Sequence, residues 1–194
     1  MDSAAFITEV SKPAPDVARR LLGSMLMRQL PDGQNLIGRI VETEAYDQAD
    51  AASHSYKGRT PRTDVMFGPP GYLYVYFTYG MHYCCNVVTG PEGHGAAVLI
   101  RAVEPLQGQG VMAQRRPAAK TIRELTNGPA KLCQAYGIDK AMNGHNLLRP
   151  PLILQLNEPP AEAEIIQTTR VGISQAKDVP WRFYINDNPY VSRA

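Results

Sequence analysis

Two glutamates lie two residues apart in a run that is otherwise typical of a β-strand, Ile40-Val41-Glu42-Thr43-Glu44-Ala45-Tyr46. Side chains alternate between the faces of a strand, so Glu42, Glu44 and Tyr46 are expected on one face. Glutamate is a poor strand former, and two interpretations are open. The pattern alone favours a solvated edge strand. The alternative is a carboxylate beside an aromatic ring, where partial desolvation makes a stronger general base.

A second pattern puts phenol rings on one face of another predicted strand. Tyr72, Tyr74 and Tyr76 alternate with Leu73, Val75 and Phe77 in the run 72–78. Tyrosines on a half-buried sheet face are commonly structural, but their ring faces also form a stacking surface for bases. Tyr79 stands beside Gly80 in a predicted tight turn. An exposed aromatic side chain there predicts a wedge that inserts into another molecule.

Three further polar residues are candidates for the same site. His54 follows Tyr46 by eight residues and is predicted to line the site, whereas the other histidines are expected to be structural or on the surface. Asn86, on the strand after the turn, offers both a donor and an acceptor to a base edge. Arg101 interrupts an apolar run and needs an acidic partner if it is buried, for which Glu44 is a candidate.

A helix that begins near Asn127-Gly128-Pro129 is a weak candidate for a phosphate site. Proline is favoured at the first helical position. The free amides and dipole of the helix start, with the charge of Lys131, suit an anion.

Hydrophobic periodicity and turn signals predict the elements that position these residues. We expect a single domain over residues 1–194, of α+β class, with a curved, mainly antiparallel β-sheet core, a protruding β-hairpin and flanking helices. A long surface loop is expected at 47–71, and Pro31-Asp32-Gly33-Gln34 predicts a hairpin turn. The predicted helices span 16–22, 109–116 and 129–137; the predicted strands span 25–30, 35–46, 72–78, 82–88, 97–103, 152–156, 170–174 and 182–185.

Composition narrows the class of protein. The 194 residues carry a net charge of +2, but residues 51–123 hold eight Lys or Arg against three Asp or Glu, a local +5 that leaves −3 for the rest. A segregated positive stretch suits a polyanion. No apolar run approaches the roughly 20 residues of a membrane span, and the N-terminus lacks a secretory signal pattern. The three cysteines form no CxxC pair and no zinc-type spacing, so we expect a reduced intracellular protein without structural metal or disulfide.

Taken in order, these segments resemble the alkyladenine (3-methyladenine) DNA glycosylase family. The Glu-Thr-Glu-Ala-Tyr run followed by Tyr-Gly-Met at this spacing is a specific signature. The resemblance extends from about residue 15 to the C-terminus and includes the runs 38–46, 52–55, 60–62, 70–76, 79–81, 98–105, 127–135 and 170–173, together with Asn86.

The resemblance implies a role for each matching residue in catalysis. Glu44 would be the general base for a water that attacks the sugar C1′. Arg101 would help to position that water, as would the main-chain carbonyl near Val171. Glu42 shares a face with Glu44, and the choice of Glu44 depends on the resemblance alone.

The resemblance also implies how DNA is held. The flipped base would lie between Tyr46 and Tyr76, with His54 completing the pocket, and Asn86 would disfavour bases that carry an extra exocyclic amino group. Tyr79 would fill the hole left in the duplex, and Met81 would support it. Arg62 and the helix start near Lys131 would contact phosphates.

The implied protein is a monofunctional DNA-3-methyladenine glycosylase of base excision repair. It would flip damaged purines of the 3-methyladenine, 7-methylguanine, hypoxanthine and ethenoadenine class out of duplex DNA and hydrolyse the N-glycosidic bond, leaving an abasic site. No metal or organic cofactor is implied. The expected partner is double-stranded DNA that contains a damaged purine, with no membrane. A monomer is expected inside the cell, cytoplasmic and nucleoid-associated in a bacterium or nuclear in a eukaryote.

The residues by themselves leave two other functions open. One is a non-catalytic nucleic-acid binding module that uses the tyrosines and the basic stretch. The other is a hydrolase of small nucleosides or sugars, in which Glu42 and Glu44, roughly 6–7 Å apart at Cβ, both point into one pocket. One departure from the family pattern concerns the pocket: Cys85 stands where relatives often carry a larger apolar residue, and is expected to loosen the wall beside Asn86.

Overall fold

The twelve-residue strand β2 (Asn35–Tyr46) is the centre of the sheet in the computed structural model, which describes residues 2–192. One edge of β2 pairs with β5 (Ala97–Gln107) along most of its length. The other edge pairs first with β1 (Met25–Gln29) and then, over Glu42–Glu44, with β8 (Arg182–Ile185). Irregularities in the β2–β5 register bend the pair, because a bulge adds local twist.

The other strands extend this sheet on both sides, and every pairing is antiparallel. Among the described residues the sheet has eight strands in the order β3-β4-β5-β2-β1-β6, with β8 joining β7 to β2. The expected α+β fold with a curved antiparallel sheet is therefore confirmed. The remaining strands are β3 (Leu73–Thr78), β4 (His82–Val88), β6 (Leu152–Gln155) and β7 (Ile165–Thr168).

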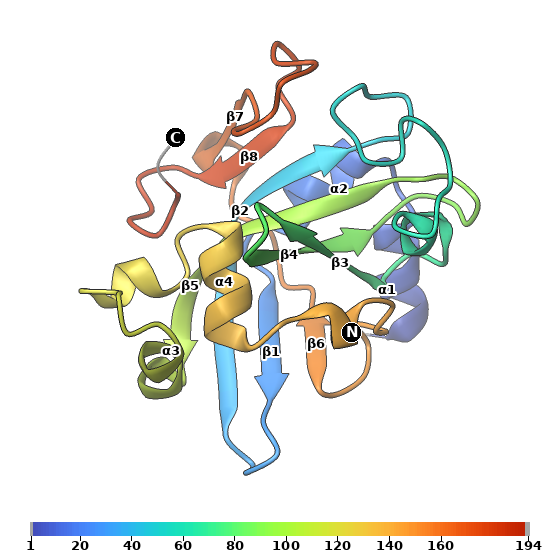
Figure 1. Cartoon of the computed structure of the whole chain (residues 1–194). Helices are drawn as coiled ribbons and strands as arrows, with labels where there is room; N and C mark the ends of the chain where they lie inside the picture. The colour runs from blue at the N-terminus through green and yellow to red at the C-terminus, as the bar shows by residue number, and fades with distance from the viewer. Residues whose placement is uncertain (1, 193–194) are drawn as a thin grey trace.

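Short helices cover the sheet and complete one main apolar core. Figure 1 shows the blue N-terminal helices behind the strands and the gold helix α4 in front of them. The core joins Phe6, Val17 and Leu132 from the helices to strand residues such as Ile40 and Ile100. None of the helices in residues 2–192 is long and apolar enough to cross a membrane. The α-helices are α1 (Ser3–Val10), α2 (Ala14–Arg20), α3 (Gln109–Arg115) and α4 (Pro129–Tyr136).

Strands β3 and β4 form the predicted hairpin with its exposed tip. Tyr79 has a positive φ of 50°, and its side chain is 81% exposed. On the flanking strand, Leu73 and Val75 enter the main core. Tyr74 and its neighbours enter a second cluster, with Met66 and Phe67 of the 3-10 turn Asp64–Phe67. The predicted alternation of the tyrosyl face with the apolar face is confirmed.

Several predicted elements differ from the observed ones. Residues 170–174 form a loop and not a strand, and the strand that pairs with β8 lies earlier, at Ile165–Thr168. The amide of Val171 donates to a side chain, so it cannot serve a strand ladder. Strand β5 continues past Pro105 to Gln107, with a register shift opposite the proline, which lacks an N–H. Helix α2 begins two residues earlier than predicted, and helix α1 was not predicted.

Candidate active site

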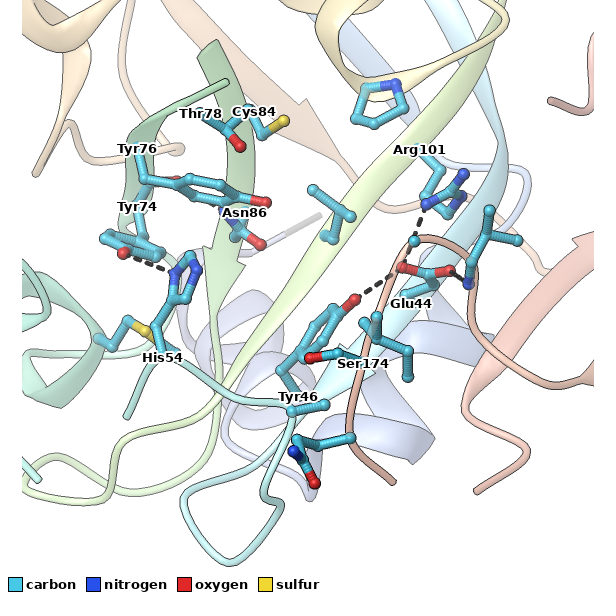
Figure 2. A pocket seen from close by; sticks show the side chains of 18 of the residues that line it. Glu44, Tyr46, His54, Tyr74, Tyr76, Thr78, Cys84, Asn86, Arg101 and Ser174 are labelled. Atoms are coloured by element: carbon cyan, nitrogen blue, oxygen red, sulfur yellow. Dashed lines mark hydrogen bonds and ion pairs between the residues drawn. The ribbon is translucent and has the colours of Figure 1, made fainter. Parts of the chain in front are cut away.

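A cavity of about 420 Å³ opens between the C-terminal half of β2 and the β3–β4 hairpin. In Figure 2, Glu44, Tyr46 and Arg101 lie on one side of it, and His54, Tyr74 and Tyr76 lie on the other. The loop that follows β7 supplies a third part of the wall through Val171–Gln175. A cavity of this volume is within the range of small-ligand sites.

The carboxylate of Glu44 is buried in the wall of this cavity and accepts two hydrogen bonds. The Val171 amide donates to Oε1 at 2.7 Å, and the Tyr46 hydroxyl donates to Oε2 at 2.8 Å. Nη1 of Arg101 forms an ion pair with Oε2 at 3.2 Å. A carboxylate offers about four lone-pair sites, so the two hydrogen bonds leave acceptor capacity on Glu44 for a further donor.

Glu42 is equally buried but does not line the cavity. Its carboxylate accepts from Nε of Arg101 at 3.0 Å and from Nε of Arg182 at 2.7 Å. It also accepts from the amide of Ser192 at 2.7 Å and from the hydroxyl of Ser192 at 2.9 Å. All four donors come from the protein, three of them to Oε1 and one to Oε2. The carboxylates are therefore not paired in one pocket, and the solvated edge strand favoured by the pattern is wrong.

Arg101 joins the two carboxylates. It extends from β5, directly beside β2, and its side chain is 8% exposed. Arg101 forms ion pairs with both Glu42 and Glu44, so it has the predicted acidic partner, Glu44, and a second one. Because Arg101 is one of the eight cations in the central basic stretch but is buried in ion pairs, it is not available to a phosphate on the surface.

The opposite wall is aromatic. Tyr74 and Tyr76 project from β3 with ring centroids 5.6 Å apart and nearly parallel. His54 meets Tyr76 edge-on at 4.5 Å, and its Nδ1 is 3.0 Å from the hydroxyl of Tyr74. Burial, together with the charge of Arg62, lowers the pKa of His54, so the ring is neutral at pH 7. Burial raises the pKa of Tyr76 far above its ordinary value, which keeps that phenol protonated.

Strand β4 contributes two side chains to the cavity. Asn86 is buried and donates to the carbonyl of Tyr74 at 3.1 Å. Cys84 is the neighbouring cavity residue, and burial raises the pKa of its thiol to about 11. Cys85 points to the other face, into the main core, where it lies beside Cys133 of α4. The expectation that Cys85 loosens the pocket wall is therefore wrong, because alternate residues of a strand face opposite sides.

The residues predicted to insert into the duplex or to contact DNA phosphates lie around the cavity mouth or farther out. Tyr79 lines the edge of the cavity, and Met81 beyond it is 70% exposed. Arg62 is exposed, with its guanidinium carbon 5.9 Å from the ring centre of Tyr76. Lys131 is half-buried and donates to Asn127 at 2.8 Å within the start of α4. Pro129 at that helix start lines the cavity.

Sequence reasoning missed the residues that hold the site from behind. Arg182 and Ser192 bind Glu42, and Arg170 packs on the ring of Tyr46. For one of them, Arg182, the sequence held a signal, because an arginine within the predicted strand 182–185 indicates a buried partner. At Val171 the amide donates to Glu44, a contact that was not predicted, and the implied role of the nearby carbonyl in positioning the water stays a prediction. Within residues 2–192, no group of three His, Cys, Asp or Glu side chains is arranged to hold a metal ion.

Comparison with known proteins agrees with this geometry. The family model described as Methylpurine-DNA glycosylase (MPG) matches residues 8–189. A relative from Carboxydothermus hydrogenoformans is 53% identical over 178 residues, 91% of this chain and 92% of the relative. One from Nitrosospira multiformis is 48% identical over 185 residues, 95% and 92% of the two chains. One from Francisella tularensis subsp. tularensis is 50% identical over 181 residues, 92% and 93%.

Each of these three relatives carries the name "Putative 3-methyladenine DNA glycosylase". The similarity covers more than nine-tenths of every chain compared and includes both sides of the cavity. The chain therefore belongs to the methylpurine-DNA glycosylase family, a family of hydrolytic DNA glycosylases.

Proposed function

We propose that this glycosylase flips a damaged purine out of duplex DNA into the cavity and hydrolyses its N-glycosidic bond with a water activated by Glu44. The observation that carries the proposal is the position of the Glu44 carboxylate, buried at the wall of an aromatic cavity with acceptor capacity that the protein does not use. The proposed substrates are duplexes that contain 3-methyladenine, 7-methylguanine, hypoxanthine or ethenoadenine, and the product is an abasic site.

The contacts of Glu44 support its role as a general base. Two hydrogen bonds and the ion pair with Arg101 fix the orientation of the carboxylate, and its remaining acceptor capacity can take a proton from a water at hydrogen-bond distance. Arg101 is rigidly held by Glu42, and its guanidinium offers a further donor for the same water. The Val171 amide orients Oε1, so this loop contributes to catalysis through its main chain.

The aromatic wall supports the binding of a flat base. Tyr46 and Tyr76 both line the cavity from opposite sides, and aromatic rings stack on any base. His54, held by Tyr74 through Nδ1, has Nε2 for a polar contact with the base. Asn86 uses one amide hydrogen on the Tyr74 carbonyl, which fixes its orientation at the wall where we propose that it excludes an extra exocyclic amino group.

The exposed hairpin tip supports insertion into the duplex. Tyr79 at the edge of the cavity and Met81 beyond it are large side chains, exposed by 81% and 70%, and wedges of this kind fill a gap in stacked bases. We propose that Arg62 and the start of α4 at Lys131 contact phosphates, and that the protein acts as a monomer inside the cell, where DNA is found.

The test is base release from duplexes that carry one hypoxanthine or one ethenoadenine, detected as alkali-labile abasic sites. Wild type should release both bases, and Glu44→Gln should slow release about 10²- to 10⁴-fold while it still binds the duplex. Glu92→Gln makes the same chemical change on the exposed surface and should match wild type.

Three outcomes would reject parts of the proposal. If wild type releases no base from either duplex or from alkylated DNA, a binding module becomes the better function. If Glu44→Gln keeps wild-type rates, Glu44 is not the base. If free nucleosides are hydrolysed and Tyr79→Ala has no effect on duplex substrates, the protein is a nucleoside hydrolase and the wedge has no role.

A further inference from the structure

A buried cation lies against the ring of Tyr46. The guanidinium carbon of Arg170 is 4.8 Å from the ring centre of Tyr46 and 5.4 Å from the ring centre of Trp181. Its side chain has no exposed surface. Two hydrogen bonds join it to the carboxylate of Asp50, one of them 3.0 Å long, and Nη1 donates to the carbonyl of Ala45 at 2.9 Å.

Arg170 cannot touch a base in the cavity. Tyr46 lines the cavity and Arg170 does not, so the guanidinium covers the ring face that is turned away from the cavity. The bond to Asp50 and the packing on Trp181 fix it there. A base that stacks on Tyr46 must therefore use the ring face opposite the arginine.

A cation on one face changes what the other face attracts. An aromatic ring draws cations through the negative charge on its faces. A guanidinium that already occupies one face polarises the ring toward itself, and its own charge repels a second cation across the ring. A neutral purine is not repelled in this way and stacks well on the electron-poor ring. The effect is strong where the cation is fixed and dry, because low dielectric leaves charges unscreened.

The opposite wall of the cavity lacks this arrangement. Arg62 lies over the ring of Tyr76, but its guanidinium carbon is 5.9 Å from the ring centre and its side chain is exposed. Water and salt screen an exposed charge. The two proposed stacking rings are therefore unequal, with a fixed buried cation behind Tyr46 and a screened cation near Tyr76.

We propose that Arg170 is a specificity-determining residue, which acts through Tyr46 to favour neutral damaged purines over cationic ones. Hypoxanthine and ethenoadenine belong to the neutral class, and 7-methylguanine, whose alkylated ring is positively charged, belongs to the cationic class. Asp50 sets the strength of the effect because it offsets part of the charge of Arg170. The inference rests on the proposed function, in which Tyr46 stacks on the flipped base.

The experiment measures a ratio within each variant, so that a loss of folded protein cancels. Single-turnover base release is measured from two duplexes of one sequence, one with 7-methylguanine and one with hypoxanthine. In the double variant Asp50→Asn, Arg170→Met the ion pair is replaced by a neutral pair, and the 7-methylguanine to hypoxanthine ratio should rise about threefold to tenfold. Arg170→Lys keeps the charge, and its ratio should stay within about twofold of wild type.

The single variant Asp50→Asn gives a prediction of opposite sign. It leaves the charge of Arg170 without its partner, so the ratio should fall below that of wild type. A ratio unchanged in the double variant, or a ratio that moves in the same direction in Asp50→Asn, overturns the inference. If the double variant does not fold, Asp50→Asn and Arg170→Lys still decide it. Absence of base release by wild type from both duplexes would instead reject the proposed function.

Discussion

Glu42 and Glu44 are two residues apart on one face of β2, share Arg101 as a partner and are both fully buried, but their surroundings differ in one respect. Around Glu42 every donor comes from the protein, and the last of them is Ser192. Around Glu44 the protein supplies two hydrogen-bond donors, and the rest of the carboxylate faces the cavity. The number of hydrogen bonds that the protein provides, four against two, and not burial or charge, distinguishes Glu42 from the carboxylate that we propose as the base.

The strongest test of this difference is the unfolding free energy of Glu42→Gln. A neutral amide there leaves Arg182 without an acidic partner and Arg101 with half of its charge compensation, so a loss of about 3–5 kcal/mol is expected. Urea unfolding measures it. Glu44→Gln should lose much less, because Arg101 keeps its contact with Glu42. Equal losses in the two variants would contradict the comparison.

A smaller effect is expected from Ser192→Ala. The variant removes the hydroxyl that bridges Glu42 and Arg101 but keeps the amide that donates to Glu42. We expect a loss of about 1–2 kcal/mol in unfolding free energy with a small change in base release. Ser3→Ala, at an exposed serine, is the matched control and should stay within about 0.5 kcal/mol of wild type.

Tyr46→Phe tests the surroundings of Glu44 by removing a single hydroxyl group that donates to it. Burial and the nearby charge of Glu44 raise the pKa of Tyr46 far above its ordinary value, so its hydroxyl remains a donor to Glu44 throughout any assay range. Its removal frees an acceptor site on Oε2 and loosens the carboxylate, and base release should slow up to about tenfold. Tyr56→Phe, at an exposed ring, should have no effect. A Tyr46→Phe rate equal to wild type would mean that the Val171 amide and the ion pair with Arg101 are enough to hold Glu44.

The smallest expected effect is a shift in the pKa of His54, which an NMR titration measures. Burial and Arg62 lower the pKa of His54 below 6.5, so protonation of its ring should begin only at acid pH. In Arg62→Gln the midpoint should move back toward 6.5, because a repelling charge has been removed. Arg59→Gln removes an exposed cation that is paired with Asp64 and should leave the His54 midpoint in place. A midpoint indifferent to Arg62 would assign the whole shift to burial.

The sequence predicted many of the residues that line the cavity but few of those that hold the cavity wall from behind. Period-two alternation correctly predicted the shared face of Glu42, Glu44 and Tyr46 and the tyrosyl face of β3, because side-chain direction in a strand depends on position alone. The proline and glycine of the 31–34 turn predicted the first hairpin. These are contacts between near neighbours in the chain, which local patterns encode.

The support could not be predicted because its contacts join distant segments. Nothing in the run around Glu42 indicates that β8 pairs beside it, or that Arg182 and Ser192 reach its carboxylate. Val171 was assigned to a strand from its apolar neighbours, whereas its amide is used by Glu44, 127 residues away. The choice between the two glutamates required knowledge of which one the rest of the chain would separate from the cavity.

The bond between Glu42 and Ser192 spans 150 residues, which has a consequence for the time at which the enzyme becomes active. A ribosome delivers the chain from its N-terminus, so strands β1 to β5 leave it long before Ser192 does. Contacts of such long sequence separation also form late in folding. A nascent chain therefore holds a sheet before it holds Arg101 in place, and the protein cannot act on DNA until Ser192 has been synthesised and has reached Glu42.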